Sequence, residues 1–256
     1  MSLLNNIKIK NLLENWLPGH VATSAWLKEM GVSRQLVQRY QQSGWVEAIG
    51  VGAYKRPKEF VGWYGAVASL QKQLSLDVHV GGPTAFSVRG GGHYLRLGKE
   101  PIFLFSVLNE HLPKWFTDFN WGNPIHHLRT STFPVDVGVG SYNHLNIELK
   151  VSAPELAILE CLYISPKAFD LLECYQILEG QQTLRPELMQ QLLVECSSVR
   201  VKRLFLYMAQ KAKLPVMKYL DLEKIDLGTG DRSIVKQGVY NSKFRISIPK
   251  ELVDYV

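Results

Sequence analysis

Three residues in the middle of the sequence have side chains suited to metal-dependent hydrolysis. Asp136 is followed by Glu148 and Lys150, which are separated by a single residue. Two carboxylates can bind Mg²⁺ together with a water molecule, and a nearby lysine can stabilise the charge that develops when a phosphodiester is cleaved. These three residues therefore define one candidate catalytic site.

This spacing resembles that of the PD-(D/E)xK nucleases, although Val135 stands where those enzymes usually have a proline. A half-buried strand explains the same residues more simply, with Glu148 and Lys150 facing water and their neighbours facing the core. We favour the strand, and so expect no catalytic residue, no metal and no cofactor. An Mg²⁺-dependent nuclease is the alternative.

A second group of residues, rich in arginine and glutamine, is suited to DNA recognition. Residues 34–42 read Arg-Gln-Leu-Val-Gln-Arg-Tyr-Gln-Gln and include no acid. Arginine can bond to O6 and N7 of guanine, and glutamine to N6 and N7 of adenine, in the major groove. The DNA-contacting candidates are Ser33, Arg34, Gln35, Gln38, Arg39 and Gln42, of which Arg34, Gln35, Gln38 and Arg39 would read bases.

A helix-turn-helix is the element that would present these side chains. Apolar residues at helical spacing run from Leu3 to Trp16, and a second helix with a Thr/Ser cap is predicted at residues 22–30. Gly31 suits a tight turn, and Ser33 can cap the next helix. Helix, glycine turn and capped second helix is the order of a helix-turn-helix.

Residues 45–57 predict two short strands joined by a glycine turn, which would form the wing of a winged helix-turn-helix. Cations on a wing contact phosphates, which set the register but carry no sequence information. The candidates in and beside the wing are Tyr54, Lys55, Arg56 and Lys58. Alternatively, the N-terminal helices form a protein-interaction module that only dimerises or docks.

The remaining sequence predicts a mixed body, so the fold class is α+β, with an N-terminal winged helix-turn-helix followed by a mixed α/β C-terminal domain. We expect a DNA-binding domain at 1–58 and an α+β domain at 59–256, with a connecting helix at 59–75. Strands are predicted at 78–80, 93–97, 102–107, 126–133, 135–139 and 145–151, and a hairpin at 239–248. Helices are predicted at 154–163, 168–178, 186–194 and 199–212.

The last of these helices offers a second basic surface. Its cationic residues and the one that follows are Arg200, Lys202, Arg203, Lys211 and Lys213, with no acid among residues 199–213. Such a face could touch DNA beside the wing or an acidic partner. A helix face that is merely solvated is the alternative.

Charge and composition agree with a small DNA-binding module on a larger body. The net charge is +6, and residues 1–60 contain eight Lys/Arg against four Asp/Glu, so they contribute +4 of it. No apolar run is long enough to span a bilayer, and the N-terminus lacks the pattern of a signal peptide, so we expect a cytoplasmic protein with no membrane partner. The three cysteines form no CxxC pair and are expected to be buried free thiols.

Several short motifs together resemble the AbiEi-type antitoxins. Besides the N-terminal module, they are Gly-Gly-Pro-Thr-Ala-Phe at residues 81–86, His93-Tyr94, and Ser-Ala-Pro-Glu-Leu-Ala-Ile-Leu-Glu at residues 152–160. Their order and spacing match over nearly the whole chain. Phe86 differs from the smaller aliphatic residue expected in the family.

The resemblance implies the antitoxin of a type IV, abortive-infection toxin–antitoxin pair. Its winged helix-turn-helix would bind inverted repeats in double-stranded DNA upstream of its own operon and repress it, as a monomer or as a weak dimer that binds cooperatively. The C-terminal domain would counteract a nucleotidyltransferase-like toxin, with or without direct contact. Members of the family carry a basic C-terminal surface that assists DNA binding, which favours such a role for Arg200, Lys202 and Arg203.

Overall fold

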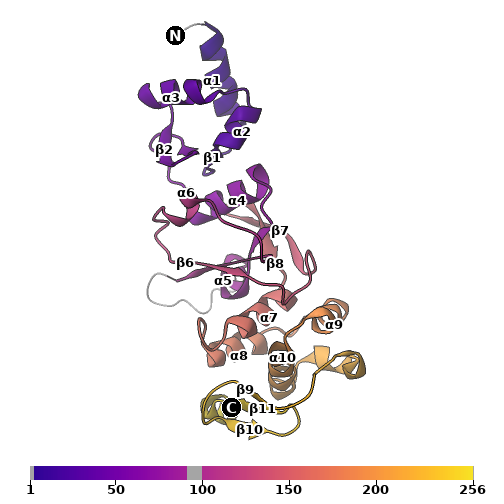
Figure 1. The fold of residues 1–256 in the computed structure, drawn as a ribbon. Helices are drawn as coiled ribbons and strands as arrows, with labels where there is room; N and C mark the ends of the chain where they lie inside the picture. The colour runs from indigo at the N-terminus through magenta and orange to yellow at the C-terminus, as the bar shows by residue number, and fades with distance from the viewer. Residues whose placement is uncertain (1–2, 91–99, 256) are drawn as a thin grey trace. The chain divides into compact units, whose positions relative to one another are not determined.

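The computed structural model of the chain describes residues 3–90 and 100–255 (Figure 1). Helices and strands are mixed along it, which confirms the α+β class. The strand predicted at 93–97 lies outside the described residues. By their mutual contacts, the described residues within 3–79, 100–129 and 141–150 form a first unit, and those within 80–90, 130–140 and 151–255 form a second.

The first unit begins with three helices whose ends match the local sequence signals. They are α1 (Leu3–Asn15), α2 (Ser24–Glu29) and α3 (Arg34–Gln42). Thr23 Oγ1 accepts a hydrogen bond from the backbone of α2 at 3.2 Å, and Ser33 Oγ accepts one from the backbone of α3 at 3.3 Å. Gly31, between the two helices, has a φ of 74°, in the left-handed region that glycine tolerates. The predicted caps and turn are therefore confirmed.

A three-stranded antiparallel sheet completes the N-terminal part. Its strands are β1 (Ala22–Thr23), β2 (Glu47–Gly50) and β3 (Ala53–Lys55), in the order β1-β3-β2. The β2–β3 turn contains Gly52 with a φ of 80°, as expected for the predicted hairpin. The helices and the sheet share one apolar core, whose buried members are Ile9, Leu12, Trp16, Ala22, Leu27, Val32, Leu36, Val37, Tyr40 and Val46.

The N-terminal part continues directly into the rest of the first unit. Helix α4 (Trp63–Gln73) packs on β1, where Ser69 Oγ donates to the carbonyl oxygen of Val21 at 2.8 Å. The backbone NH of Thr23 donates to Gln73 Oε1, also at 2.8 Å. The first unit therefore contains α4 as well as the N-terminal helices and sheet.

The largest sheet has five strands in the order β6-β5-β4-β8-β7. They are β4 (Val78–Val80), β5 (Ile102–Ser106), β6 (Ile125–Arg129), β7 (Val139–His144) and β8 (Ile147–Ser152), and a short helix, α6 (Lys114–Thr117), lies between β5 and β6 in the chain. Strand β5 is buried throughout and pairs in parallel with β6. The strand predicted at 135–139 is wrong, because Asp136 and Gly138 have φ values of 61° and 79° and form a turn. Strand β7 begins only at Val139.

The α-helices of the second unit are α5 (Gly82–Val88), α7 (Pro154–Ile164), α8 (Leu171–Glu179), α9 (Pro186–Glu195), α10 (Val199–Lys211) and α11 (Lys250–Asp254). Helix α7 is buried along nearly all of its length and packs against α5, α8, α9 and α10. Buried Glu160 of α7 accepts hydrogen bonds from the NH of Gly82 at 2.7 Å and from Ser152 Oγ at 2.8 Å. This carboxylate therefore ties the start of α5 and the end of β8 to α7.

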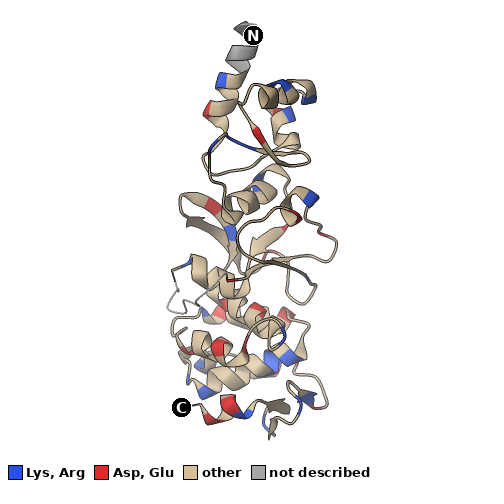
Figure 2. Ribbon diagram, turned by 90° about the vertical axis from the view of Figure 1, so that its left-hand side faces the viewer, with Lys and Arg blue, Asp and Glu red and all other residues tan. Residues whose placement is uncertain are grey.

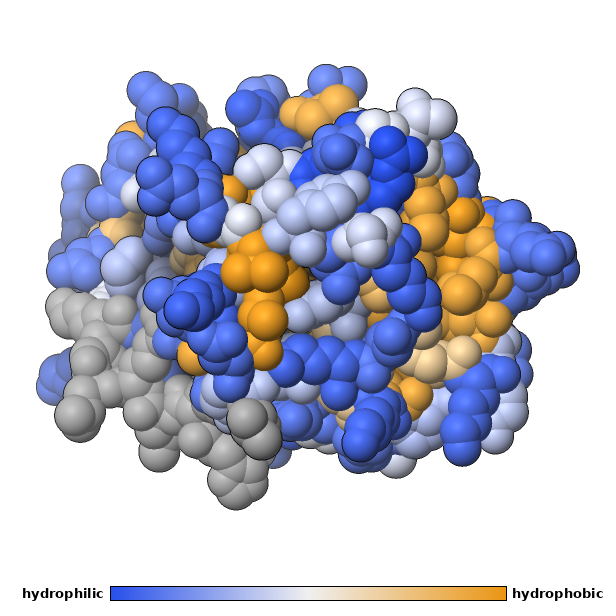
Figure 3. All heavy atoms as spheres, turned by 90° about the horizontal axis from the view of Figure 1, so that it is seen from below, coloured by the Kyte–Doolittle hydropathy of each residue, from blue (hydrophilic) through white to orange (hydrophobic). Residues whose placement is uncertain are grey.

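A small sheet near the C-terminus consists of β9 (Arg232–Ser233), β10 (Val239–Asn241) and β11 (Ile246–Ile248), in the order β10-β11-β9. Strands β10 and β11 are antiparallel, which confirms the predicted hairpin. Acidic and basic residues are interspersed along the helices of the second unit (Figure 2). The face shown in Figure 3 likewise mixes hydrophilic and apolar side chains.

Candidate nucleic-acid interface

Helix α3 presents its arginines and glutamines to solvent. Leu36, Val37 and Tyr40 are buried in the core, while the polar side chains of the helix are exposed. The exposed residues are Arg34, Gln35, Gln38, Arg39, Gln41 and Gln42. Ser33 is also exposed, although its hydroxyl oxygen caps the helix. Within the described part of the chain, neither Arg34 nor Arg39 forms an ion pair, so both charges are free to meet a ligand.

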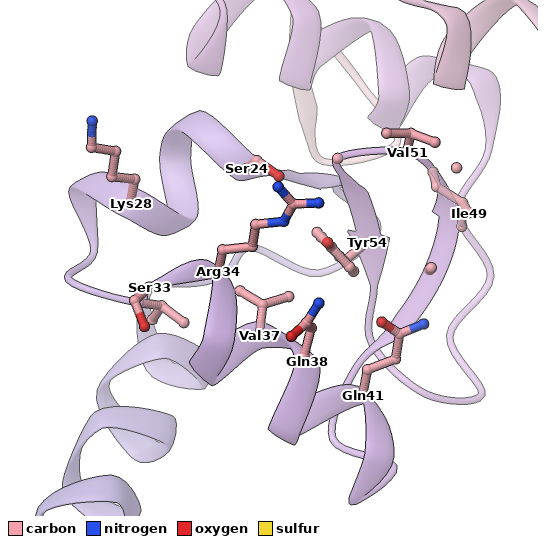
Figure 4. Close-up of a pocket in the computed structure, with 14 residues that line it drawn as sticks. Ser24, Lys28, Ser33, Arg34, Val37, Gln38, Gln41, Ile49, Val51 and Tyr54 are labelled. Carbon is pink, nitrogen blue, oxygen red and sulfur yellow. The ribbon is translucent and has the colours of Figure 1, made fainter.

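A groove of about 1120 Å³ separates α3 from the β2–β3 hairpin. Figure 4 shows Arg34, Gln38 and Gln41 along its α3 side, with Tyr54 and Val51 from the hairpin across from them. The described residues that line it are Ser24, Lys28, Val32, Ser33, Arg34, Val37, Gln38, Gln41, Ala48, Ile49, Gly50, Val51, Gly52 and Tyr54, and none of them is acidic. A polar rim with two cations over an apolar floor suits a ligand that is negatively charged on one side and apolar on the other.

The cations of the hairpin are engaged within the protein. Lys55 Nζ lies 2.9 Å from Glu47 Oε2, and the pKa of Glu47 is lowered chiefly by Lys55. Arg56 donates to the carbonyl oxygen of Trp16, and its Nε lies 3.6 Å from Glu59 Oε2. Both cationic side chains are therefore partly neutralised, unlike those of α3.

The sequence contains a signal for these pairs that net charge alone does not show. Glu47 and Lys55 are direct partners in the β2–β3 ladder, and opposite charges on facing strand positions attract. Arg56 and Glu59 are three residues apart. Lys58 is exposed, and its backbone NH donates to Glu47 Oε1 at 3.3 Å. Lys58 is the hairpin-side candidate with the most accessible charge.

The basic face predicted on α10 is not present as a surface, which corrects the expectation from the sequence. Lys202 and Arg203 are only 3% and 2% exposed. The Arg203 guanidinium donates to four backbone carbonyl oxygens, those of Leu227, Gly228, Gly230 and Arg245. Its charge therefore orders the chain that follows α10 and is not available to a partner.

Two further cations of this predicted face also bond to backbone carbonyls. Arg200 donates to Tyr163 O and Ser165 O, both at 2.6 Å. Lys211 donates to Val253 O at 3.1 Å and to Tyr255 O at 2.7 Å, close to the C-terminus. Lys213, beyond the helix, is exposed. Of the five cations, Arg200, Arg203 and Lys211 thus bond to the backbone of the protein itself, and Lys202 is buried.

Two of the three nuclease candidates, Glu148 and Lys150, lie on the exposed side of β8, as the alternation of the strand predicted. In β8, Ile147 and Leu149 are buried, whereas Glu148 and Lys150 are exposed, so the amphipathic strand is confirmed. Glu148 accepts hydrogen bonds from Lys72 Nζ and, at 2.7 Å, from Ser141 Oγ. Lys72 is the main cause of the lowered pKa of Glu148.

No metal-binding group supports the nuclease alternative in the part of the chain that the structure describes. Asp136 lies in the turn before β7. Among residues 3–90 and 100–255, no three His, Cys, Asp or Glu side chains are placed to hold a metal ion together. The same residues contain no helix with the length and apolar character needed to cross a bilayer. All three cysteines are buried free thiols, as expected.

Comparison with known families identifies both halves of the chain. Residues 5–97 match the model of the N-terminal domain of AbiEi antitoxin transcriptional regulators, and residues 99–249 match that of the AbiEi antitoxin transcriptional regulators of type IV toxin–antitoxin systems. The fold is similar to the crystal structure of the RV2827C protein from Mycobacterium tuberculosis, with a TM-score of 0.63 and 13% identity, over 96% of this chain and 91% of that one. A search of curated protein sequences found no match.

Proposed function

Since this chain belongs to the AbiEi antitoxin family of transcriptional regulators, from type IV toxin–antitoxin systems, we propose that it represses its own operon by binding the promoter through a winged helix-turn-helix. In this proposal α3 enters the major groove and the β2–β3 hairpin is the wing. The role is regulatory and not catalytic, and its place is the cytoplasm, where promoter DNA is found. The operator is expected to contain inverted repeats, bound by a monomer or by a weak dimer with cooperativity.

One observation carries this proposal: the exposed side of α3 bears arginine and glutamine without an acid and without an internal ion pair. Glutamine can pair with adenine edges in the major groove, and arginine can bind either guanine edges or the phosphates that border the groove. The adjoining groove has no acidic lining residue, so it offers phosphates no repulsion. On the hairpin, by contrast, Glu47 and Glu59 offset the cations.

A mobility-shift experiment with duplex DNA from upstream of the gene tests the proposal. The wild-type chain should shift this DNA, and the double variant Arg34→Glu/Arg39→Glu should not. Lys167→Glu is a matched control, because Lys167 is an exposed cation in the second unit and not in the interface. Equal binding by the double variant would contradict the role of α3, and no shift with the wild type would favour a module that only dimerises or docks.

The antitoxin role is proposed to act on a nucleotidyltransferase-like toxin encoded beside this gene. Its support is the match of residues 99–249 to the type IV antitoxin family. Co-expression of the toxin with the double α3 variant separates the two roles, if the variant is produced from an unrelated promoter. We expect cells to survive, because counteraction is assigned to the second part of the chain. If cells that express the folded variant die, DNA binding is required for the antitoxin effect.

A further inference from the structure

The exposed side of α3 has an internal order that the residue types alone do not show. Gln35, Gln38 and Gln42 have the i, i+3, i+7 spacing of a single line along a helix, on the side away from the buried residues. Arg34 lies to the hairpin side of this line, where it lines the groove. Arg39 lies to the other side and does not line the groove. The helix therefore has a ridge of glutamines with one arginine on each flank.

We propose that the glutamine ridge reads A·T base pairs. Arg34 and Arg39, which the residue types alone assign to bases, would instead bind the phosphates of the two strands that border the major groove. The inference deepens the proposed function and rests on it. A glutamine amide can accept a hydrogen bond from N6 of adenine with its oxygen and donate one to N7 with its nitrogen. Three glutamines in a row thus favour adenine at successive positions along the groove.

The dimensions of helix and groove separate the two roles. A helix with its side chains is about 10–12 Å across, and the major groove is about 12 Å wide. Because the helix fills the groove, the side opposite its buried stripe faces the base edges, and its flanks face the two backbones. Gln38 is at the centre of the exposed ridge, and the two arginines are on the flanks.

The groove beside α3 fits a sugar–phosphate strand on the Arg34 side. Arg34 points toward the hairpin across the groove, Lys28 is its other cationic lining residue, and Ile49 and Val51 of the hairpin provide an apolar surface for the sugars. Val51 at the tip of the hairpin is 96% exposed, so apolar surface is available there for such a contact. Arg34 and Lys28 are the cationic residues among those that line this groove, whereas Lys55 and Arg56 are paired with Glu47 and Glu59 outside it.

Selection of binding sites from a library of random DNA duplexes tests this assignment and does not require the operator sequence. The full-length wild-type chain should enrich a motif with consecutive A·T pairs. Gln38→Ala should reduce discrimination at one of these positions by about 5- to 150-fold. Arg34→Ala and Arg39→Ala should keep the same motif, lose affinity on every duplex alike, and each reduce the slope of log K against log salt by about 0.9.

An independent readout is to replace a single adenine by 7-deazaadenine, at the position where Gln38→Ala loses discrimination. Loss of N7 should weaken wild-type binding and have no further effect on Gln38→Ala, since the side chain that would donate to N7 is already missing from that variant. Gln191→Ala is the matched control, because Gln191 is exposed on a helix of the second unit. All these side chains are exposed, and equal thermal melting of the variants will show that they fold.

Two outcomes would overturn the inference in different ways. A motif with G·C pairs that disappears in Arg34→Ala or Arg39→Ala would assign base reading to the arginines, and DNA binding itself would stand. Failure of the wild-type chain to bind any duplex in the library would remove the proposed function, and the inference with it.

Discussion

Glu47 Oε2 lies 2.9 Å from Lys55 Nζ, across a directly paired position of the β2–β3 ladder. The carboxylate also accepts a hydrogen bond from the NH of Lys58 at the end of the hairpin. Glu47 thus contacts both Lys55 and Lys58, two residues that their charge alone would predict to bind phosphates. The net positive charge that the hairpin offers to DNA depends on this pair.

Glu47→Gln should release Lys55 and increase the affinity for DNA of any sequence. We expect the slope of log K against log salt to steepen by up to about one, because Lys55 then becomes free to replace a counterion. Lys55→Met should leave the slope nearly unchanged. Glu29→Gln is the control, since it removes one exposed acid of the same module. If the slope of log K against log salt is much shallower in Lys55→Met than in the wild type, the lysine leaves Glu47 and contacts a phosphate when DNA binds.

The pH dependence of stability should reflect His20, which is buried and whose Nδ1 donates a hydrogen bond to Pro18 O at 2.9 Å. Burial is the main reason that its pKa is lowered from 6.5, and Lys72 lowers it further while Glu59 opposes this. Below 6.5 the unfolded chain therefore binds more protons than the folded chain, so stability falls as the pH drops through this window.

Urea unfolding at about pH 8 and about pH 5 measures this effect. The wild type should lose more unfolding free energy between the two values than His20→Gln does. His127, whose pKa is lowered chiefly by burial, accounts for part of the remaining change. Identical losses in both proteins would mean that the pKa of His20 is the same in the folded and in the unfolded chain.

Gly65→Ala should destabilise the first unit. A Cβ at this position would lie 1.8 Å from the carbonyl oxygen of Gly19, so the backbone would have to move. We expect a loss of roughly 1–3 kcal/mol in unfolding free energy, in spite of the better helix propensity of alanine. At Gly140 an added Cβ meets nothing within 4 Å, and Gly140→Ala should change stability by less than about 0.5 kcal/mol. Similar melting curves for both variants would show that α4 can shift away from Gly19.

Arg203→Met should destabilise the second unit without an effect on DNA binding by α3. The substitution keeps an apolar stem of similar length but leaves four carbonyl oxygens without their donor. Because buried acceptors without partners are costly, we expect a loss on the order of 3 kcal/mol or more in thermal or urea unfolding. Lys213→Ala is the exposed control. If the Arg203→Met protein is as stable as the wild type but binds DNA less well, α10 is part of the DNA interface.

Local sequence was a good guide wherever an element is specified by its own residues. Ser33, Gly31 and the spacing of Leu36, Val37 and Tyr40 determine α3, and the structure has this helix at the predicted residues. The predicted alternation of buried and exposed residues in β8 is also confirmed. The region before β7 was mistaken for a strand because Val135, Val137 and Val139 alternate, whereas the positive φ of Asp136 makes it a turn.

What the sequence determined by itself was the order of the elements and the chemical character of α3, because caps, turns and periodicity act over a few residues. Which charges are free was decided only by the tertiary structure. Arg203 is buried because it donates to carbonyl oxygens of residues more than twenty positions further along the chain. Lys55 is partly neutralised by Glu47 on the neighbouring strand. The surroundings of a charge are set by distant segments brought together in the fold, and no local pattern contains that information.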